Sequence, residues 1–332
     1  MVDALKENQF WYVPWQRFNT APGKDVLRLR TLLEHYFREY FVSNGYEQLT
    51  SPKIVSQGLE QTITPFQIDF FGEPAILSKG PQTYKSILIA AGIPKVFEIG
   101  PIFRMEQKYG PDHVAEFVAI DADFSVNSRG TPVKCVDDVI DEFEDMLVYA
   151  VNRLCDEGVG KGLNLNIRPP VKFPRISIQD AYKILAGNGV RKEQWDDLSK
   201  ADETILGDWA AREHGSDFLV VGSYPAAYRF FYYKRHDDNP QLTHSFDVLY
   251  RGREISTCAL KVNDLDTLLK QAREQDLDLE ISVPHLVDAY RQGLPTFGGG
   301  GIGFDRLVQK LLNLQNIRDA LIISREPGRL HP

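Results

Sequence analysis

Apolar residues recur every three to four positions along several stretches of the chain, a spacing typical of amphipathic helices. The first stretch runs from Val26 to Phe41 and ends at Asn44–Gly45, where the glycine suits a left-handed helix end. The same spacing predicts helices over residues 82–91, 136–154, 178–185, 264–273 and 283–292. We expect residues 178–214 as a whole to form a helical insertion on the main body.

Short apolar runs between these helices predict strands. They cover residues 46–55 (interrupted by Pro52), 75–77, 96–103, 117–121, 218–221, 227–233, 244–250, 254–262 and the glycine-rich run 298–303. The runs dominate the middle of the chain, and no regular alternation of strand, helix and strand connects them. This order predicts an antiparallel sheet flanked by helices, which is an α+β fold.

Composition narrows the class of protein. The chain has 332 residues and a formal net charge of -8, which suits small-molecule chemistry better than broad nucleic-acid binding. The three cysteines, Cys135, Cys155 and Cys258, contain no Cys-x-x-Cys pair, so they give no zinc or redox signature and favour a reduced, cytoplasmic compartment. No stretch reaches the ~20 apolar residues that a membrane span needs, and we expect no membrane partner.

Residues 96–121 predict a β-hairpin with charged side chains on one face. Arg104 and Glu106 lie two positions apart on the outgoing segment, and Asp121 ends the returning strand. An arginine beside carboxylates suits a ligand that carries a phosphate on one side and an amine on the other. A simple ion pair is the alternative, and for an arbitrary hairpin it is the commoner one.

The glycine-rich run continues into Phe304 and Arg306. It contains the spacing G-x-G-x-x-G, but a dinucleotide fingerprint also needs a β-α-β unit and an acid about 20 residues further on. We favour a strand whose bare backbone lets a flat ligand approach, followed by a helix that starts near Phe304. Arg306 then lies in the first helical turn, where a bound anion would offset its unfavourable interaction with the helix dipole.

Two more pairs carry candidate chemistry. Asp247 and Glu254 lie on paired strands, where two carboxylates can converge on a hard cation such as Mg²⁺, although a solvated surface pair is the alternative. Gln82 and Lys85 lie three apart and share a helical face. Together with the arginines these groups suit a nucleoside triphosphate, but GVGKG at 158–162 lacks the spacing and the Ser or Thr of a P-loop.

These segments resemble the three signature motifs of class II aminoacyl-tRNA synthetases. The motifs are the long first helix with Pro52 after it, the hairpin with FRME and EF, and GGGGIGFDRL. SKGPQTYK, SFDVLYRGREIS and the segment 303–329 are similar to the aspartyl and asparaginyl branch. The resemblance implies a catalytic domain over residues 26–332, an N-terminal arm over 1–25, and a homodimer formed through the first helix and the Pro52 strand.

By position, the resemblance also implies an ATP site. Arg104 and Arg306 would be the catalytic cations, at the α-phosphate and the γ-phosphate. Glu106 would hold the adenine amino group and Phe117 would stack on adenine, while Glu254 would contact ATP through the metal. The implied Mg²⁺ ligands are Asp247 and Glu254.

An amino-acid site is implied in the same way. Glu60, Gln82 and Asp121 would surround the ammonium group of the substrate, and Lys85 would pair with a carboxylate. Lys261 stands where the family has an arginine that grips the side-chain carboxylate of aspartate. A lysine cannot supply the two-pronged contact of a guanidinium, so the identity or the orientation of the acid is open.

The aspartyl and asparaginyl enzymes carry an anticodon-binding barrel before this domain. Only about 25 residues precede the first helix here, too few for an OB-fold barrel, and we therefore predict that tRNA is not a partner. The resulting hypothesis is an enzyme that uses ATP and Mg²⁺ to activate aspartate or a close analogue as an acyl-adenylate. It would pass the acyl group to free ammonia, like an archaeal-type asparagine synthetase. The alternatives are transfer to a tRNA or another amine, and a non-catalytic sensor of ATP or an amino acid.

Overall fold

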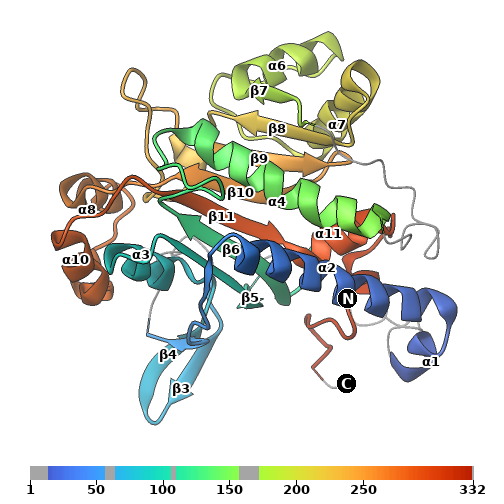
Figure 1. Cartoon of the computed structure of the whole chain (residues 1–332), viewed down its shortest axis with the longest axis horizontal. Helices are drawn as coiled ribbons and strands as arrows, with labels where there is room; N and C mark the ends of the chain where they lie inside the picture. Colours follow the sequence, from blue (N-terminus) through green and yellow to red (C-terminus); the bar gives the residue numbers. More distant parts are fainter. Residues whose placement is uncertain (1–13, 57–63, 106–109, 157–171, 331–332) are drawn as a thin grey trace.

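The computed structural model describes residues 14–56, 64–105, 110–156 and 172–330. An eight-stranded sheet forms its centre, with the strand order β1-β5-β6-β11-β10-β9-β8-β7 (Figure 1). The strands are β1 (Glu47–Gln48), β5 (Lys95–Phe103), β6 (Glu116–Phe124), β7 (Arg175–Ser177), β8 (Phe218–Gly222), β9 (Ser245–Tyr250), β10 (Glu254–Leu260) and β11 (Gly298–Gly303). The inner pairs are antiparallel, and the edge pairs β1–β5 and β7–β8 are parallel. The predicted α+β class is confirmed, and the described residues contain no closed barrel.

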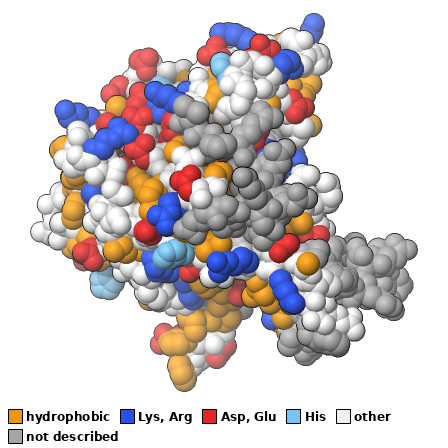
Figure 2. Space-filling model, turned by 45° about the vertical axis from the view of Figure 1, so that its right-hand side comes forward, with side chains coloured by type: hydrophobic (Ala, Val, Ile, Leu, Met, Phe, Trp, Pro, Cys, Tyr) orange, Lys and Arg blue, Asp and Glu red, His pale blue; other side chains and the backbone are white. Residues whose placement is uncertain are grey.

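A second, smaller sheet projects from the body (Figure 1). Its strands β2 (Ile54–Val55), β3 (Gln67–Phe70) and β4 (Glu73–Leu77) pair in the order β2-β4-β3. The turn between β3 and β4 has positive φ at Phe71 and Gly72. Phe71 is 93% exposed at this tip, and Figure 2 shows hydrophobic side chains along the projection.

Helices cover both faces of the central sheet (Figure 1). They are α1 (Pro14–Phe18), α2 (Ala21–Ser43), α3 (Gln82–Ala90), α4 (Val136–Asp156), α6 (Ile178–Gly187), α7 (Lys200–His214), α8 (Leu265–Arg273), α9 (Leu279–Ser282), α10 (Pro284–Arg291) and α11 (Phe304–Leu311), with short 3-10 turns η3 (Ala226–Tyr228) and η4 (Ile317–Ala320). Thr20 caps α2, so this helix begins at Ala21, inside the stretch 1–25 that was expected to be an N-terminal arm. A proline occupies the first turn of α2, a position that suits proline because the N–H it lacks would have no acceptor within the helix. Gly45 ends α2 with φ of 75°, as predicted.

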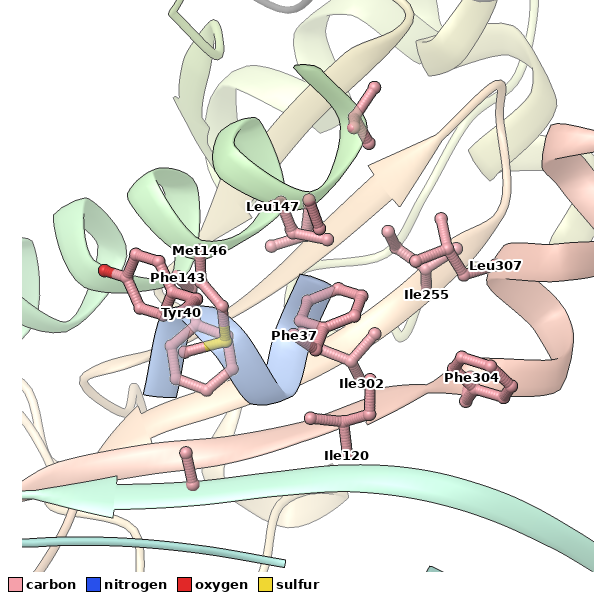
Figure 3. Packing of buried hydrophobic residues seen from close by; sticks show 14 of the residues in the cluster. Phe37, Tyr40, Ile120, Phe143, Met146, Leu147, Ile255, Ile302, Phe304 and Leu307 are labelled. Carbon is pink, nitrogen blue, oxygen red and sulfur yellow. The ribbon is translucent and has the colours of Figure 1, made fainter. Parts of the chain in front are cut away.

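The main core lies between the sheet and the pair α2 and α4. Figure 3 shows Phe37 of α2 and Leu147 of α4 above Ile120 and Ile302, which belong to β6 and β11. These four side chains are at most 1% exposed, and burying an apolar side chain of this size stabilises the fold by ~1.5–3 kcal/mol. The long helical periodicities therefore predicted the core correctly.

One predicted strand is wrong. Residues 227–233 form no strand: the first two belong to the turn η3, and the N–H of Tyr233 donates to the carbonyl of Phe230 in another turn. Phe231, Tyr232 and Tyr233 are all buried although they are consecutive, so tertiary packing and not strand alternation explains the aromatic run. Residues 46–55 give two separate two-residue strands, β1 and β2, with Pro52 between them.

The helical insertion consists of α6 and α7 beside β7 and β8 (Figure 1). Ser177 caps α6, because its hydroxyl accepts the N–H of Asp180 at 3.1 Å. Ser199 and Asp202 form a reciprocal capping box at the start of α7. The insertion therefore has two well-defined helix starts, and the second becomes important for the site described next.

Candidate active site

A cavity opens on the face of the sheet opposite α2 and α4. Its empty volume is about 1020 Å³, including the solvent at its mouth. Along β6, Ile120 packs in the core, so strand alternation turns Phe117 and Asp121 to the other face, where they line the cavity. The lining also includes Gln82, Arg104, Glu254, Lys261, Gly301 and Arg306. Candidate residues from distant segments therefore surround one cavity.

The glycine strand β11 forms the floor of this cavity. A Cβ on Gly299 would lie 2.1 Å from the carbonyl oxygen of Ala122, and one on Gly301 would lie 3.1 Å from Oδ1 of Asp121. Side chains at these positions would collide with β6 or fill the space above the strand. The predictions of a bare glycine strand and of a helix that starts at Phe304 are both confirmed, and the antiparallel neighbours of β11 exclude a β-α-β unit here.

Arg104 and Arg306 lie at one end of the cavity, which we call the triphosphate end, after the ligand that we propose for it. The Arg104 guanidinium lies over the Phe117 ring, 5.3 Å from its centroid. Nη1 of Arg306 donates to the carbonyl of Glu254 at 2.7 Å and lies 3.5 Å from Oε1 of that residue. The Nε atoms of both arginines are buried and have no hydrogen-bond partner among the described residues. An anionic ligand would supply the missing acceptors.

Asp247 is less available for a metal than the sequence suggests. Its Oδ2 accepts a hydrogen bond from Nη2 of Arg229 at 2.6 Å, and Arg229 lies 3.8 Å over the Tyr224 ring. Burial raises the pKa of Asp247 to about 6, against the opposing effect of Arg229. The other oxygen, Oδ1, is buried and has no hydrogen-bond partner among residues 14–56, 64–105, 110–156 and 172–330. Arg229, which was not among the predicted site residues, is the buried partner of Asp247, and neither of the two lines the cavity.

The acids Asp247 and Glu254 fit a hard divalent cation in part. Carboxylate oxygens are the ligands that Mg²⁺ prefers, usually one or two of them with water and phosphate completing the shell. The orphan Oδ1 of Asp247 and the half-exposed carboxylate of Glu254 can serve in this way. Within the described residues no group of three or more His, Cys, Asp or Glu side chains could hold a metal alone.

The other end of the cavity, which we call the amino-acid end after the ligand that we propose for it, holds a hydrogen-bond network, which we define as Gln82, Lys85, Asp121, Asp123 and Lys261. Nε2 of Gln82 donates to Asp123 at 2.6 Å, and Oε1 accepts from Nζ of Lys261 at 3.1 Å. Nζ of Lys85 lies 2.9 Å from Asp123 and 3.3 Å from Asp121. Burial disfavours the charged form of Lys85, but the two aspartates outweigh it and raise its pKa.

Lys261 faces the cavity and forms no ion pair with the acids that the structure describes. Its Nζ lies 4.9 Å from the Tyr232 ring centroid and 4.7 Å from that of Tyr233. Burial lowers its pKa to about 8, although Asp123 raises it. Among the described residues its Nζ donates one hydrogen bond, to Gln82, so the ammonium keeps donors for a ligand.

Some of the predicted site residues do not line the cavity or lie outside the described residues, and some lining residues were not predicted. Lys85 is fully buried behind the cavity wall, and its carboxylate partners are aspartates of the chain. Glu60 and Glu106 lie outside the described residues. Sequence analysis missed Asp123, although it lies two positions after Asp121 and so shares its strand face. It also missed the aromatic wall of Phe230, Tyr232 and Tyr233.

Comparisons with known proteins extend this picture. Residues 14–326 match the family model of tRNA synthetases class II (D, K and N). The chain is 34% identical over 323 residues to the aspartate–tRNA(Asp/Asn) ligase of Aeropyrum pernix, with 96% of the chain and 72% of that enzyme covered. It is 32% identical to the aspartate–tRNA(Asp) ligase of Pyrococcus furiosus, covering 92% of the chain and 69% of that enzyme.

A solved structure of the asparaginyl-tRNA synthetase from Pyrococcus horikoshii, complexed with asparaginyl-adenylate, superposes with a TM-score of 0.88. It is 26% identical and covers 98% of this chain and 74% of its own. None of the helices described is long and apolar enough to cross a membrane.

The prediction that tRNA is not a partner is wrong. The relatives are ligases named for tRNA, and an acidic net charge does not exclude tRNA from a family that binds it. The recognition of the class II core and of an AMP- and pyrophosphate-forming ligase is confirmed. The chain belongs to the class II tRNA synthetase family (D, K and N), a family of ATP-dependent ligases.

Proposed function

We propose that the chain activates aspartate or a close analogue as an acyl-adenylate, with ATP and Mg²⁺. The main support for this proposal is that the two ends of the cavity carry different polar groups. Two arginines whose Nε–H groups have no acceptor in the described part of the chain lie at one end, Gln82, Asp121 and Lys261 at the other, and bare glycine backbone between them. A nucleotide and an amino acid fit this arrangement side by side.

In the proposed reaction, a carboxylate oxygen of the amino acid attacks the α-phosphorus of ATP. An acyl–phosphate bond forms, the bond to pyrophosphate breaks, and pyrophosphate leaves with both electrons of that bond. Arg104 stabilises the charge that develops on the α-phosphate, and Arg306 holds the leaving group. A bound Mg²⁺, held by Glu254 and Oδ1 of Asp247, would neutralise phosphate charge.

At the amino-acid end, Asp121 accepts hydrogen bonds from the substrate ammonium and Lys261 donates to its side-chain carboxylate. The names of the relatives support aspartate. Lysine contributes one point of attachment where a guanidinium gives two, so its grip fixes the orientation of the acid less strictly.

Two acceptors for the acyl group are proposed. Transfer to tRNA is supported by the relatives, which are tRNA ligases. Transfer to ammonia, which would make asparagine, is supported by Lys261, because a looser grip admits aspartate with its side-chain carboxylate towards ATP. The two acceptors give different products and can be separated directly.

The test is amino-acid-dependent exchange of labelled pyrophosphate into ATP, run over a panel of amino acids. We expect exchange with aspartate, and no exchange with any amino acid would contradict the proposed activation. A second assay supplies ATP, Mg²⁺ and aspartate with either ammonium or total tRNA. Asparagine formed without tRNA identifies ammonia as the acceptor, and acid-precipitable labelled aspartate identifies tRNA.

The homodimer belongs to this proposal as well. Val42 at the end of α2 is 63% exposed, and Ile54 in β2 is 47% exposed, beside the Pro52 segment. Large apolar residues left exposed on neighbouring elements suit contact with a second copy. Sedimentation velocity should give a dimer for the parent chain and a monomer for the double variant Val42→Asp/Ile54→Asp; a monomeric parent chain would contradict it.

A further inference from the structure

The helical insertion contacts the turn that leads into Glu254. A Cβ on Gly207 of α7 would lie 2.4 Å from both Cα and N of Gly252, the residue between β9 and β10. Gly252 has φ of 64°, which also favours glycine. Two glycines thus allow the helix backbone to lie directly on the turn.

Glu203 makes the polar contact at this junction. Its Oε2 accepts the backbone N–H of Glu254 at 3.0 Å. The pairing register of β9 and β10 shifts between Glu254 and Ser256, and such bulges redirect side chains beside functional sites. The direction of the Glu254 side chain therefore depends on an acceptor that the insertion supplies.

The start of α7 also contacts the opposite wall of the cavity. Arg253 donates to the carbonyl of Lys200 at 3.1 Å and lies 3.5 Å from Glu203. Nζ of Lys200 lies 2.9 Å from Asp112. Asp112 belongs to the segment between β5 and β6 and lines the cavity. The first turn of one helix thereby connects both walls of the triphosphate end.

We propose that Glu203 is a positioning residue that orients Glu254 towards the divalent cation accompanying ATP. The inference rests on the proposed function, since it concerns the cation of that site. Arg306 donates to Glu254 as well, so a displaced Glu254 also shifts a phosphate-binding arginine. Through Glu203, the insertion contributes to the active site although Glu203 does not line the cavity.

The experiment measures cation affinity directly, with Mn²⁺ as a spin probe titrated into the whole 332-residue chain in the presence of ATP. Glu203→Ala should raise the Kd for Mn²⁺ about tenfold, the usual effect of removing an outer partner of a metal ligand. Glu203→Gln keeps an acceptor oxygen, so its Kd should stay within about twofold of the parent value. The Mg²⁺ concentration that half-saturates pyrophosphate exchange should move in parallel.

Asp208→Asn is the matched control, because it removes an exposed acid from the same helix, and it should leave both values unchanged. Thermal melts show whether each variant is folded. A folded Glu203→Ala protein with parental Mn²⁺ affinity would overturn the proposal, as would a Glu203→Gln protein as weak as Glu203→Ala. Failure of the proposed function looks different: the parent chain would show no exchange with any amino acid, while Mn²⁺ binding still reports on Glu203.

Discussion

The two ends of the cavity satisfy their charged groups in opposite ways. At the amino-acid end, Lys85 and Gln82 are saturated by contacts with Asp123 at 2.6–2.9 Å. At the triphosphate end, Arg104 and Arg306 each keep a buried Nε without a partner among the described residues. Lys85 is paired with an aspartate of the protein at one end, whereas the arginines at the other end carry donors without an acceptor among the described residues.

This difference separates structural from catalytic roles. Removing a member of a saturated buried network leaves another charge uncompensated, which destabilises the fold. Removing a cation whose Nε–H lacks an acceptor should cost the free protein little folding free energy. It should instead slow the reaction, because the interaction that this cation makes in the transition state is lost. Changes at the two ends should therefore affect different measurements, and the following predictions test this contrast.

The largest effect should come from Arg104→Ala. The rate of aspartate-dependent pyrophosphate exchange should fall by up to about 10³-fold, because a preorganised donor at the developing charge is lost. Tm should stay within about 2 °C of the parent value, since Nε of Arg104 donates no hydrogen bond to the described residues. Arg129→Ala, which removes an exposed arginine paired with Asp145, is the control. A fall in Tm as large as that of a core mutant would break the contrast.

Asp123→Asn should show the reverse pattern. It removes the acid nearest to Lys85, whose side chain is 0% exposed, so urea denaturation should show a loss of about 3 kcal/mol in the free energy of unfolding. The double variant Lys85→Met/Asp123→Leu removes both charges and should recover most of that loss. Unchanged stability of Asp123→Asn would mean that Asp121 alone compensates the lysine.

The fold was predictable to the extent that it depends on periodicity and glycine. The pattern from Val26 to Phe41 indicates one buried helical face, and that face packs on the sheet. The run 298–303 predicts a strand without side chains, and Gly299 has no room for one. The aromatic run 227–233 was wrongly predicted to be a strand. Its consecutive aromatic residues are buried by packing from several directions, and this burial cannot be inferred from the local sequence.

The site was predictable where chemistry and strand alternation coincide. Arg104, Asp121 and Arg306 are found at one cavity, as expected. Arg229 and Glu203 were missed because each acts through a distant partner, Asp247 and Glu254 respectively. Such contacts bring together residues whose separation in the chain gives no spacing signal.

The smallest predicted effect concerns Lys261, the one member of the amino-acid network without a close acid. Its pKa of about 8 means that it is charged at pH 7 and loses its proton as the pH rises through 8. A neutral amine no longer attracts a carboxylate, so KM for aspartate should be flat below pH 8 and then rise by up to about tenfold per pH unit. Lys261→Arg stays charged over this range and should give a flat profile between pH 7 and about 9. An equal rise in both proteins would assign the titration to the substrate or to another group, and would place Lys261 with the structural residues of the network.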